Sequence, residues 1–581
     1  MPVHSRILGP RFLRGTAGLL ALGLLSGCGA AGATQSTATS SATAVVALPV
    51  QVSPNWWFPV ISSADYGDSN FQMNVMMYEP LIHISRTDGI DYHRSLAKSV
   101  TYNAQGTRYV ITLNKKWHWS NGRPVTAQDV VFTWNILKAT STGASNLPWG
   151  YGGAGSGGIP DRWSSVRANG NYQVIVTLNQ PSNPNWFIHN GLAAIVPVPK
   201  SQWDKHPNNM TKELKFILSV ANSPGNAVYD VVDGPYHFHG MKPNNYWSFV
   251  PNSHYDGHPS SLRKVIFQYE SSAATEFLGL RNGTINVGYL PTSDWNARHE
   301  LTGDKLTSPY QFGFTFLQPN YNSKAPGGLG PVFQQLYVRQ ALEMGIDQPL
   351  MIKAFFHNKG VLENDPIPPE PHTVFYDRQL SSQVYPFNPK QGKALLLSHG
   401  WKLHNGVMEK HGVKLAFTLL FVSGSTSSAN IVQLVKHDWA AEGVQVSLQS
   451  APFDQVLSTA QQSDPQKWNM AFWGPSSWTY EPDYYPTGGS FFLAGAGANQ
   501  GGYNSSTMNQ LIKKSYAPGT PAQITAALNA YLRDTAQQIP DLFLPYTPTL
   551  SEHALYLHGI VSTYNPITTF LYPNLWTVSA H

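Results

Sequence analysis

The sequence predicts an α/β protein with more than one lobe. Its 581 residues exceed what a single hydrophobic core holds, so several domains are expected. Between residues 415 and 448, an apolar strand, a helix that ends at Gly443 and a second strand follow one another. Such alternation is typical of α/β folds, in which helices cover a sheet. A strand and a capped helix between residues 109 and 137 indicate the same class.

The stretch 109–137 is the most regular part of the chain. Apolar side chains alternate with others over 109–113, which predicts a strand with one buried face. Asn121 and Gly122 then favour a tight turn, because both tolerate a positive φ. Thr126 and Asp129 have the spacing of a capping box, in which each side chain accepts a hydrogen bond from the backbone of the other. A helix is therefore expected to begin after Thr126.

The same patterns predict the other elements. Helices are expected at 71–79, 273–280, 390–399, 429–442 and 521–538, with two more inside 332–356. Strands are expected at 45–52, 172–178, 247–250, 265–267, 285–287, 415–422, 444–448 and 542–547.

The composition describes an unusually neutral protein. Hydrophobic residues make up 42% of the chain and charged residues only 12%, about half of the usual fraction. With 38 basic and 33 acidic residues, the net charge of +5 is too small to predict nucleic-acid binding. Few carboxylates also leave few groups to protonate, so we expect tolerance to acid.

The N-terminus predicts export and membrane anchoring. A basic segment containing Arg6, Arg11 and Arg14 precedes an apolar run at 16–25 that is too short to span a bilayer, so 1–27 is predicted to be a signal peptide. It ends in Leu-Ser-Gly followed by Cys28, the only cysteine of the chain, and this resembles a bacterial lipobox. We expect Cys28 to carry the lipid, residues 28–44 to form a flexible tether, and the protein to lie on the outer face of the cell membrane.

No catalytic motif is present in the sequence. There is no G-x-S-x-G elbow, no H-E-x-x-H and no phosphate-binding loop, and the match to a dinucleotide fingerprint at 150–155 lacks the flanking strand and helix. We therefore predict a protein that is not an enzyme and that has no cofactor and no metal. His237 and His239, with His118 as a third candidate, leave a metal site as an alternative.

Two aromatic stretches are the candidate binding surfaces. Asn55, Trp56 and Trp57 follow the first predicted strand, and neighbouring side chains of an extended chain point to opposite sides. At least one of the rings at 56–58 is therefore expected to face a cleft or a partner. The second stretch, 473–486, is rich in rings and prolines and reads as a loop that lines a ligand cleft. Its candidate residues are Trp473, Trp478, Tyr480, Glu481 and Asp483.

Four motifs together carry a family resemblance. Residues 119–134 read W-S-N-G-R-P-V-T-A-Q-D-V-V-F-T-W, and DGPY at 233–236, VRQAL at 338–342 and the segment 394–401 follow in the same order. They resemble the oligopeptide- and dipeptide-binding proteins (family 5) of peptide ABC importers. The resemblance implies a two-lobed periplasmic-binding-protein fold of class II, of the large three-domain type, with a hinge and a central cleft. It also implies a monomer that delivers its ligand to ABC permease subunits.

The resemblance also implies domain limits. Domain I is expected to comprise 45–85, 233–291 and 546–581, with domain II at 86–232 and domain III at 292–545. Gly288 and Tyr289 align with backbone contacts to the ligand. The family loop usually carries an Asp that pairs with the peptide's α-amino group, but Ser476, Ser477, Trp478 and Thr479 occupy that region here, and the nearby acids are Glu481 and Asp483.

Peptide capture is the leading functional hypothesis. An acidic group that faces the cleft would distinguish it from the alternatives. An oligosaccharide is the alternative ligand, because Trp56, Trp57, Trp473 and Trp478 could stack on sugars. Nickel or a metal chelate is a third possibility that depends on the histidines. A secreted hydrolase, the hypothesis from a different class, would require paired carboxylates in the cleft.

Overall fold

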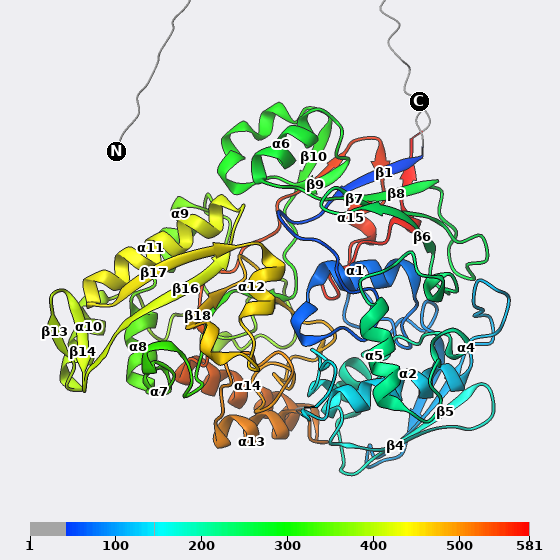
Figure 1. Ribbon diagram of the computed structural model, residues 1–581, viewed down its shortest axis with the longest axis horizontal. Coiled ribbons are helices and arrows are strands. Elements are labelled where there is room, and N and C mark those ends of the chain that lie inside the picture. The colour runs from blue at the N-terminus through cyan, green and yellow to red at the C-terminus, as the bar shows by residue number, and fades with distance from the viewer. Residues whose placement is uncertain (1–41, 145, 580–581) are drawn as a thin grey trace, which may run out of the picture. The chain divides into compact units, whose positions relative to one another are not determined.

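The computed structural model describes residues 42–144 and 146–579 (Figure 1). The predicted signal peptide and the predicted lipidation site Cys28 lie outside the described residues. Within the described part of the chain, no helix is long and apolar enough to cross a membrane.

A seven-stranded mixed sheet gathers strands from distant parts of the chain. Strand β1 lies near its centre and pairs in parallel with β8 and β9, while the remaining pairs are antiparallel. The order is β10 (Asp304–Thr307), β21 (Ser551–Ala554), β9 (Val287–Tyr289), β1 (Thr43–Ala47), β8 (Lys264–Gln268), β7 (Tyr246–Pro251) and β6 (Tyr236–Lys242). Residues from both ends of the described chain therefore meet in one sheet.

The predicted strand and capped helix are confirmed in a four-stranded antiparallel sheet. Helix α2 (Ala127–Thr140) packs on β4 and β5, and the Thr126 amide donates to the Asp129 carboxylate at 2.8 Å as the capping box predicts. The sheet order is β2 (Ala97–Tyr102), β3 (Arg108–Leu113), β5 (Gln173–Leu178) and β4 (Trp163–Ala168).

The predicted strand–helix–strand unit at 415–448 is also confirmed. Strands β16 (Ala416–Val422) and β17 (Gln445–Ala451) pair in parallel, and α11 (Thr426–Glu442) connects them and packs on both. Gly443 ends the helix with φ +88°, the left-handed conformation that glycine adopts without steric cost. The sheet continues through β18 (Met470–Phe472), β12 (Phe316–Pro319) and β20 (Leu542–Phe543).

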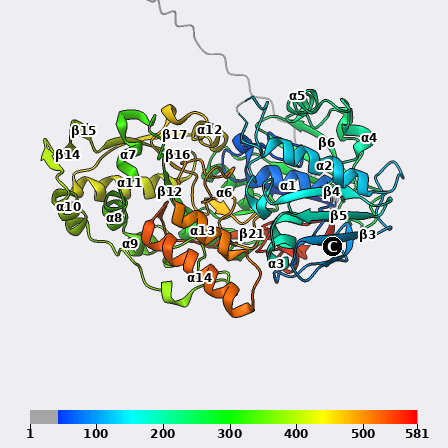
Figure 2. The same ribbon diagram turned by 90° about the horizontal axis from the view of Figure 1, so that it is seen from below.

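Helices surround this five-stranded sheet. Figure 2 shows the sheet with its helices on one side of the view and the four-stranded sheet with α2 on the other. The fold is thus a two-lobed α/β architecture. The helices are α8 (Leu336–Met344), α9 (Gln348–Ala354), α10 (Pro389–Ser398), α12 (Phe453–Thr459), α13 (Ser506–Ser515) and α14 (Pro521–Gln538).

Prolines shorten two predicted strands. The strand expected at 45–52 ends at Ala47, and Val52 instead closes a turn by donating to the Pro49 carbonyl at 3.1 Å. The strand expected at 542–547 is limited to β20, shortly before Pro545. Proline has no N–H to donate to a sheet, so a continuous ladder cannot pass through either position.

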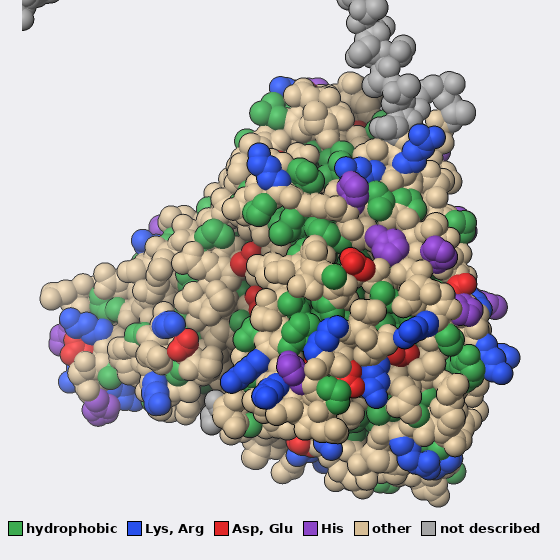
Figure 3. Space-filling model, turned by 45° about the vertical axis from the view of Figure 1, so that its right-hand side comes forward, with side chains coloured by type: hydrophobic (Ala, Val, Ile, Leu, Met, Phe, Trp, Pro, Cys, Tyr) green, Lys and Arg blue, Asp and Glu red, His purple; other side chains and the backbone are tan. Residues whose placement is uncertain are grey.

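The surface agrees with the low charged fraction of the sequence. Figure 3 shows one face on which Lys, Arg, Asp and Glu side chains are scattered among uncharged ones, and no large area of a single sign stands out. Long-range electrostatic steering of a charged macromolecule is not expected from such a face.

Candidate ligand-binding cavity

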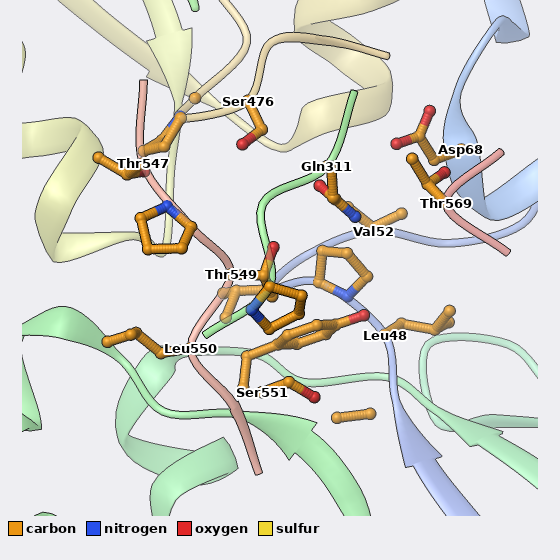
Figure 4. Close-up of a pocket in the computed structure, with 18 of the residues that line it drawn as sticks. Leu48, Val52, Asp68, Gln311, Ser476, Thr547, Thr549, Leu550, Ser551 and Thr569 are labelled. Atoms are coloured by element: carbon orange, nitrogen blue, oxygen red, sulfur yellow. The ribbon is translucent and has the colours of Figure 1, made fainter. Parts of the chain in front are cut away.

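A cavity of about 840 Å³ is enclosed by four separated stretches of the chain. Its lining comes from 46–86, 267–311, 422–476 and 547–571, apart from single residues at 356 and 371. Figure 4 shows Asp68 and Thr569 at one side of this space and Thr547 at the opposite side, with Leu550 and Ser551 below. The volume lies within the usual range for small-ligand sites.

The wall is rich in neutral hydrogen-bonding groups. They include the side chains of Ser308, Gln311, Ser476, Thr547, Thr549 and Ser551. Leu48, Val52 and Leu550 add apolar surface between them. A wall of this kind suits a ligand with many polar groups and little net charge.

Segment 308–311 lines the cavity and contains backbone donors without a protein partner. Two of its carbonyls are held in place, since the Thr549 amide donates to the Pro309 carbonyl at 3.0 Å and the Tyr546 hydroxyl donates to the Gln311 carbonyl at 2.9 Å. Among the described residues, the amides of Tyr310 and Gln311 have no protein acceptor. The segment is therefore held in position by its carbonyls, while two of its N–H groups are left without a protein acceptor.

Asp68 is the acidic side chain that the cavity exposes. It is the first residue of α1 (Asp68–Met77), and its Oδ1 accepts a hydrogen bond from the Thr479 hydroxyl at 2.9 Å. Within the described chain it forms no ion pair. The surrounding protein raises the pKa of Asp68 above the ordinary value for an aspartate, and the bond from Thr479 opposes that rise.

The two other charged residues of the lining are already engaged. The Glu276 Oε1 accepts the backbone N–H of Tyr289 at 2.8 Å, the side chain is buried, and burial raises its pKa well above the ordinary value for a glutamate. Arg86 is exposed and donates to the Ser562 carbonyl at 2.6 Å. Asp68 is thus the carboxylate that remains accessible to a ligand.

Few of the residues predicted to bind ligand line this cavity. Tyr289 and Trp473 do, whereas Gly288 is buried next to Tyr289 in β9, and Asn55 is half-buried and donates from Nδ2 to Asp65 at 3.0 Å.

The rings at 56–58 are all buried in protein, so the expectation that one of them faces a cleft or a partner is wrong. Trp56 packs edge-on against Trp149 at 5.1 Å, and Trp57 packs against Phe238 at 5.2 Å. Neighbouring side chains do point to opposite sides, as the extended backbone requires, but protein covers both sides. The sequence pattern at 56–58 could not show that other segments of the protein cover the second side as well.

In the aromatic loop that begins at Trp473, some rings pack inside the protein and Trp473 lines the cavity. Tyr480 is buried with its ring 4.5 Å from that of Phe312, and its hydroxyl donates to the Pro366 carbonyl at 2.5 Å. Trp478 lies in β19 (Trp478–Thr479), which pairs with β11 (Gly313–Phe314), and its ring packs on Phe491 at 4.7 Å. Neither belongs to the cavity lining.

The two acids of the loop also lie away from the main cavity. Asp483 is buried, and it accepts hydrogen bonds from Ser156 Oγ at 3.2 Å, from Ser490 Oγ at 2.9 Å and from Asn190 Nδ2. Burial raises its pKa to about 6, while the bonds from Ser490 and Ser156 oppose that rise. Glu481 lines a separate cavity of about 60 Å³.

Sequence reasoning missed Asp68 and the donors of segment 308–311. Asp68 stands before the predicted helix at 71–79, but Thr479 is 411 positions away, so local periodicity carries no signal that joins them. Segment 308–311 lies in a stretch for which the sequence predicts neither a helix nor a strand, so no pattern pointed to its donors.

The described residues contain no group of three or more His, Cys, Asp and Glu side chains arranged to hold a metal ion. His237 and His239 lie on β6, and neither lines the cavity.

Comparison with known proteins decides the family. The model of the bacterial extracellular solute-binding proteins, family 5, matches residues 91–491, which is more than half of the chain. The chain belongs to this family. The family 5 resemblance read from the sequence motifs is confirmed, and members of the family are by description solute-binding proteins.

Relatives and solved structures agree with this family 5 assignment. The oligopeptide-binding protein AppA of Bacillus subtilis is 23% identical over 487 residues, which cover 82% of each chain. The structure of AppA with a nonapeptide has a TM-score of 0.77 at 20% identity and covers 93% of this chain and 99% of that one. NikZ of Campylobacter jejuni with Ni(L-His) has a TM-score of 0.71 at 18% identity, with coverages of 92% and 99%. The two-lobed solute-binding fold is thereby confirmed.

Proposed function

We propose that this family 5 protein captures peptides in the cavity described above and delivers them to the permease of an ABC importer. The observation that carries the proposal is segment 308–311 of the cavity lining, whose Tyr310 and Gln311 amides have no acceptor within the described chain. An extended peptide offers a carbonyl at every residue, so it can satisfy such donors whatever its side chains are. The neutral wall around the segment accommodates varied side chains.

Relatives support peptides over the other ligand classes. AppA is named for oligopeptides, and its solved structure holds a nonapeptide. NikZ is described with Ni(L-His), but no histidine belongs to the lining of this cavity. Of the four tryptophans offered for stacking on an oligosaccharide, only Trp473 lines it. The description of the family as solute-binding favours binding over the secreted hydrolase.

Export and anchoring are part of the proposal. We infer that residues 1–27 are removed, that Cys28 carries a lipid and that the residues after it tether the protein to the outer face of the cell membrane, where it acts as a monomer. The tether is shorter than the predicted 28–44, because Thr43 and Ala44 belong to β1. Export is supported by the extracellular location in the family's description. The domain limits also remain a proposal, with domain I at 45–85, 233–291 and 546–581, domain II at 86–232 and domain III at 292–545.

A thermal-shift screen tests the ligand class. Purified protein is heated with a tetrapeptide library, with maltotetraose and with nickel plus L-histidine, and native mass spectrometry identifies what remains bound. We expect a rise in Tm with peptides alone, because a ligand that binds only the folded state stabilises it by mass action. A rise with maltotetraose or with nickel–histidine and none with peptides would overturn the proposal.

A further inference from the structure

We propose that Asp68 binds the free α-amino group of the ligand, so that the cavity selects peptides with an unblocked N-terminus. This inference rests on the proposed function and specifies the class of peptide. No other side chain of the cavity lining combines a negative charge with free access to the space.

The carboxylate of Asp68 is positioned to meet a ligand. Asp68 lies on the cavity wall at the start of α1, and Figure 4 shows its side chain at the edge of the open space. The Thr479 hydroxyl occupies Oδ1 and orients the group, while Oδ2 accepts no hydrogen bond within the described part of the protein. An ammonium group has donors to spare for such a charged acceptor, and charge-assisted bonds of this kind are stronger than neutral ones.

The groups around Asp68 form an environment that suits a positive ligand group. Burial raises the pKa values of Glu481, Tyr289 and Tyr564 above their ordinary values, and the negative charge of Asp68 raises them further. These neighbours are acids and phenols, and Arg86, the cation of the lining, is exposed and engaged with the Ser562 carbonyl. A positive ligand group would relieve this concentration of acids, whereas a ligand carboxylate would add to it.

The loop 474–479 supports Asp68 and has no charged side chain of its own. Between Gly474 and Thr479 the loop contains no acid, and its Ser476 amide is already bound to the Thr315 hydroxyl at 3.0 Å. The loop instead reaches α1 through Thr479. The proposed amine site is therefore built from two elements that are 411 positions apart, and one of them supplies the charge while the other holds it in place.

The test compares a tetrapeptide library that has free amino termini with the same library after N-acetylation, both read by native mass spectrometry and calorimetry. We expect the wild-type protein to bind the acetylated library at least about 30-fold more weakly, as removal of one partner of a desolvated charge pair does. Asp68→Asn is expected to bind the free library as weakly as the acetylated one. Asp68→Glu keeps the charge and should retain a preference for free amines.

Asp161→Asn is the matched control, because it makes the same change at an exposed acid outside the cavity lining and should bind like the wild type. Circular dichroism establishes that each variant is folded. If the wild type binds both libraries equally and Asp68→Asn changes nothing, the amine site is overturned while peptide capture stands. If the wild type retains neither library, the proposed function itself fails and the amine site with it.

Discussion

Asp68 and Asp483 are aspartates with opposite surroundings. Asp483 is 1% exposed, and bonds from Ser156, Asn190 and Ser490 fill both of its oxygens. Asp68 is exposed to the cavity and has a single donor, Thr479. A carboxylate whose acceptor positions are filled by protein holds segments together, whereas one with an unfilled oxygen is available to a ligand. Counting donors therefore separates two roles that residue type alone does not.

The same contrast exists between tryptophans, and it gives the largest expected effect. Trp57 is 0% exposed and packs on Phe238 and Phe249, whereas Trp473 borders the cavity. Trp57→Ala should lower the free energy of unfolding by about 3–5 kcal/mol, because it leaves a large void in a close-packed core. Trp473→Ala should cost less, since this side chain borders the cavity and keeps 9% of its surface exposed. Urea denaturation of both variants measures the difference, and equal losses would contradict the distinction between core and wall.

Asp483→Ala should weaken the binding of all ligands alike. The substitution leaves the buried donors of Ser156, Asn190 and Ser490 without their acceptor, which disfavours the arrangement in which the segments at 156–190 and 483–490 are joined. We expect affinity to fall by about tenfold for free and for acetylated peptides, in contrast to the selective loss expected at Asp68. Calorimetry with both libraries measures this, and a loss confined to free peptides would show that Asp483 also meets the ligand amine.

Glu442 has a third kind of surroundings, since its carboxyl is buried and has no hydrogen-bond partner among the described residues. We expect this carboxyl to make the free energy of unfolding depend on pH. Burial first, and the charge of Asp438 second, raise its pKa to about 9, and burial raises the pKa of Asp365 to about 8. The unfolded chain releases these protons near pH 4, so between about pH 4 and 9 the native state holds more protons. Stability should therefore fall as pH rises through this window.

Glu442→Gln isolates this contribution. The variant should match the wild type near pH 4.5 and exceed its free energy of unfolding by at least about 1 kcal/mol at pH 8, because only the wild type must then hold a proton that its unfolded chain has released. Urea denaturation at both values measures the difference. A wild-type protein that is more stable at pH 8 than at pH 5 would contradict the assignment and also the acid tolerance expected from the composition.

Much of the fold was predictable, because its elements are specified by neighbours in the chain. The capping box of Thr126 and Asp129 and the glycine after α11 involve residues only a few positions apart. The candidate site was less predictable. The tryptophans at 56 and 57 and the acid at 483 were expected in the cleft from local composition, but distant segments cover them.

Features that the sequence alone determines involve residues close together in the chain, whereas features that the tertiary structure decides involve residues far apart. Periodicity, caps and turns depend on the backbone within one or two turns of chain, so the α/β class, the helices and the family motifs were available from the residues alone. Which ring is covered and which carboxylate remains open depends on packing between remote segments. Asp68 meets Thr479 across 411 positions, and only the tertiary structure brings them to one cavity wall.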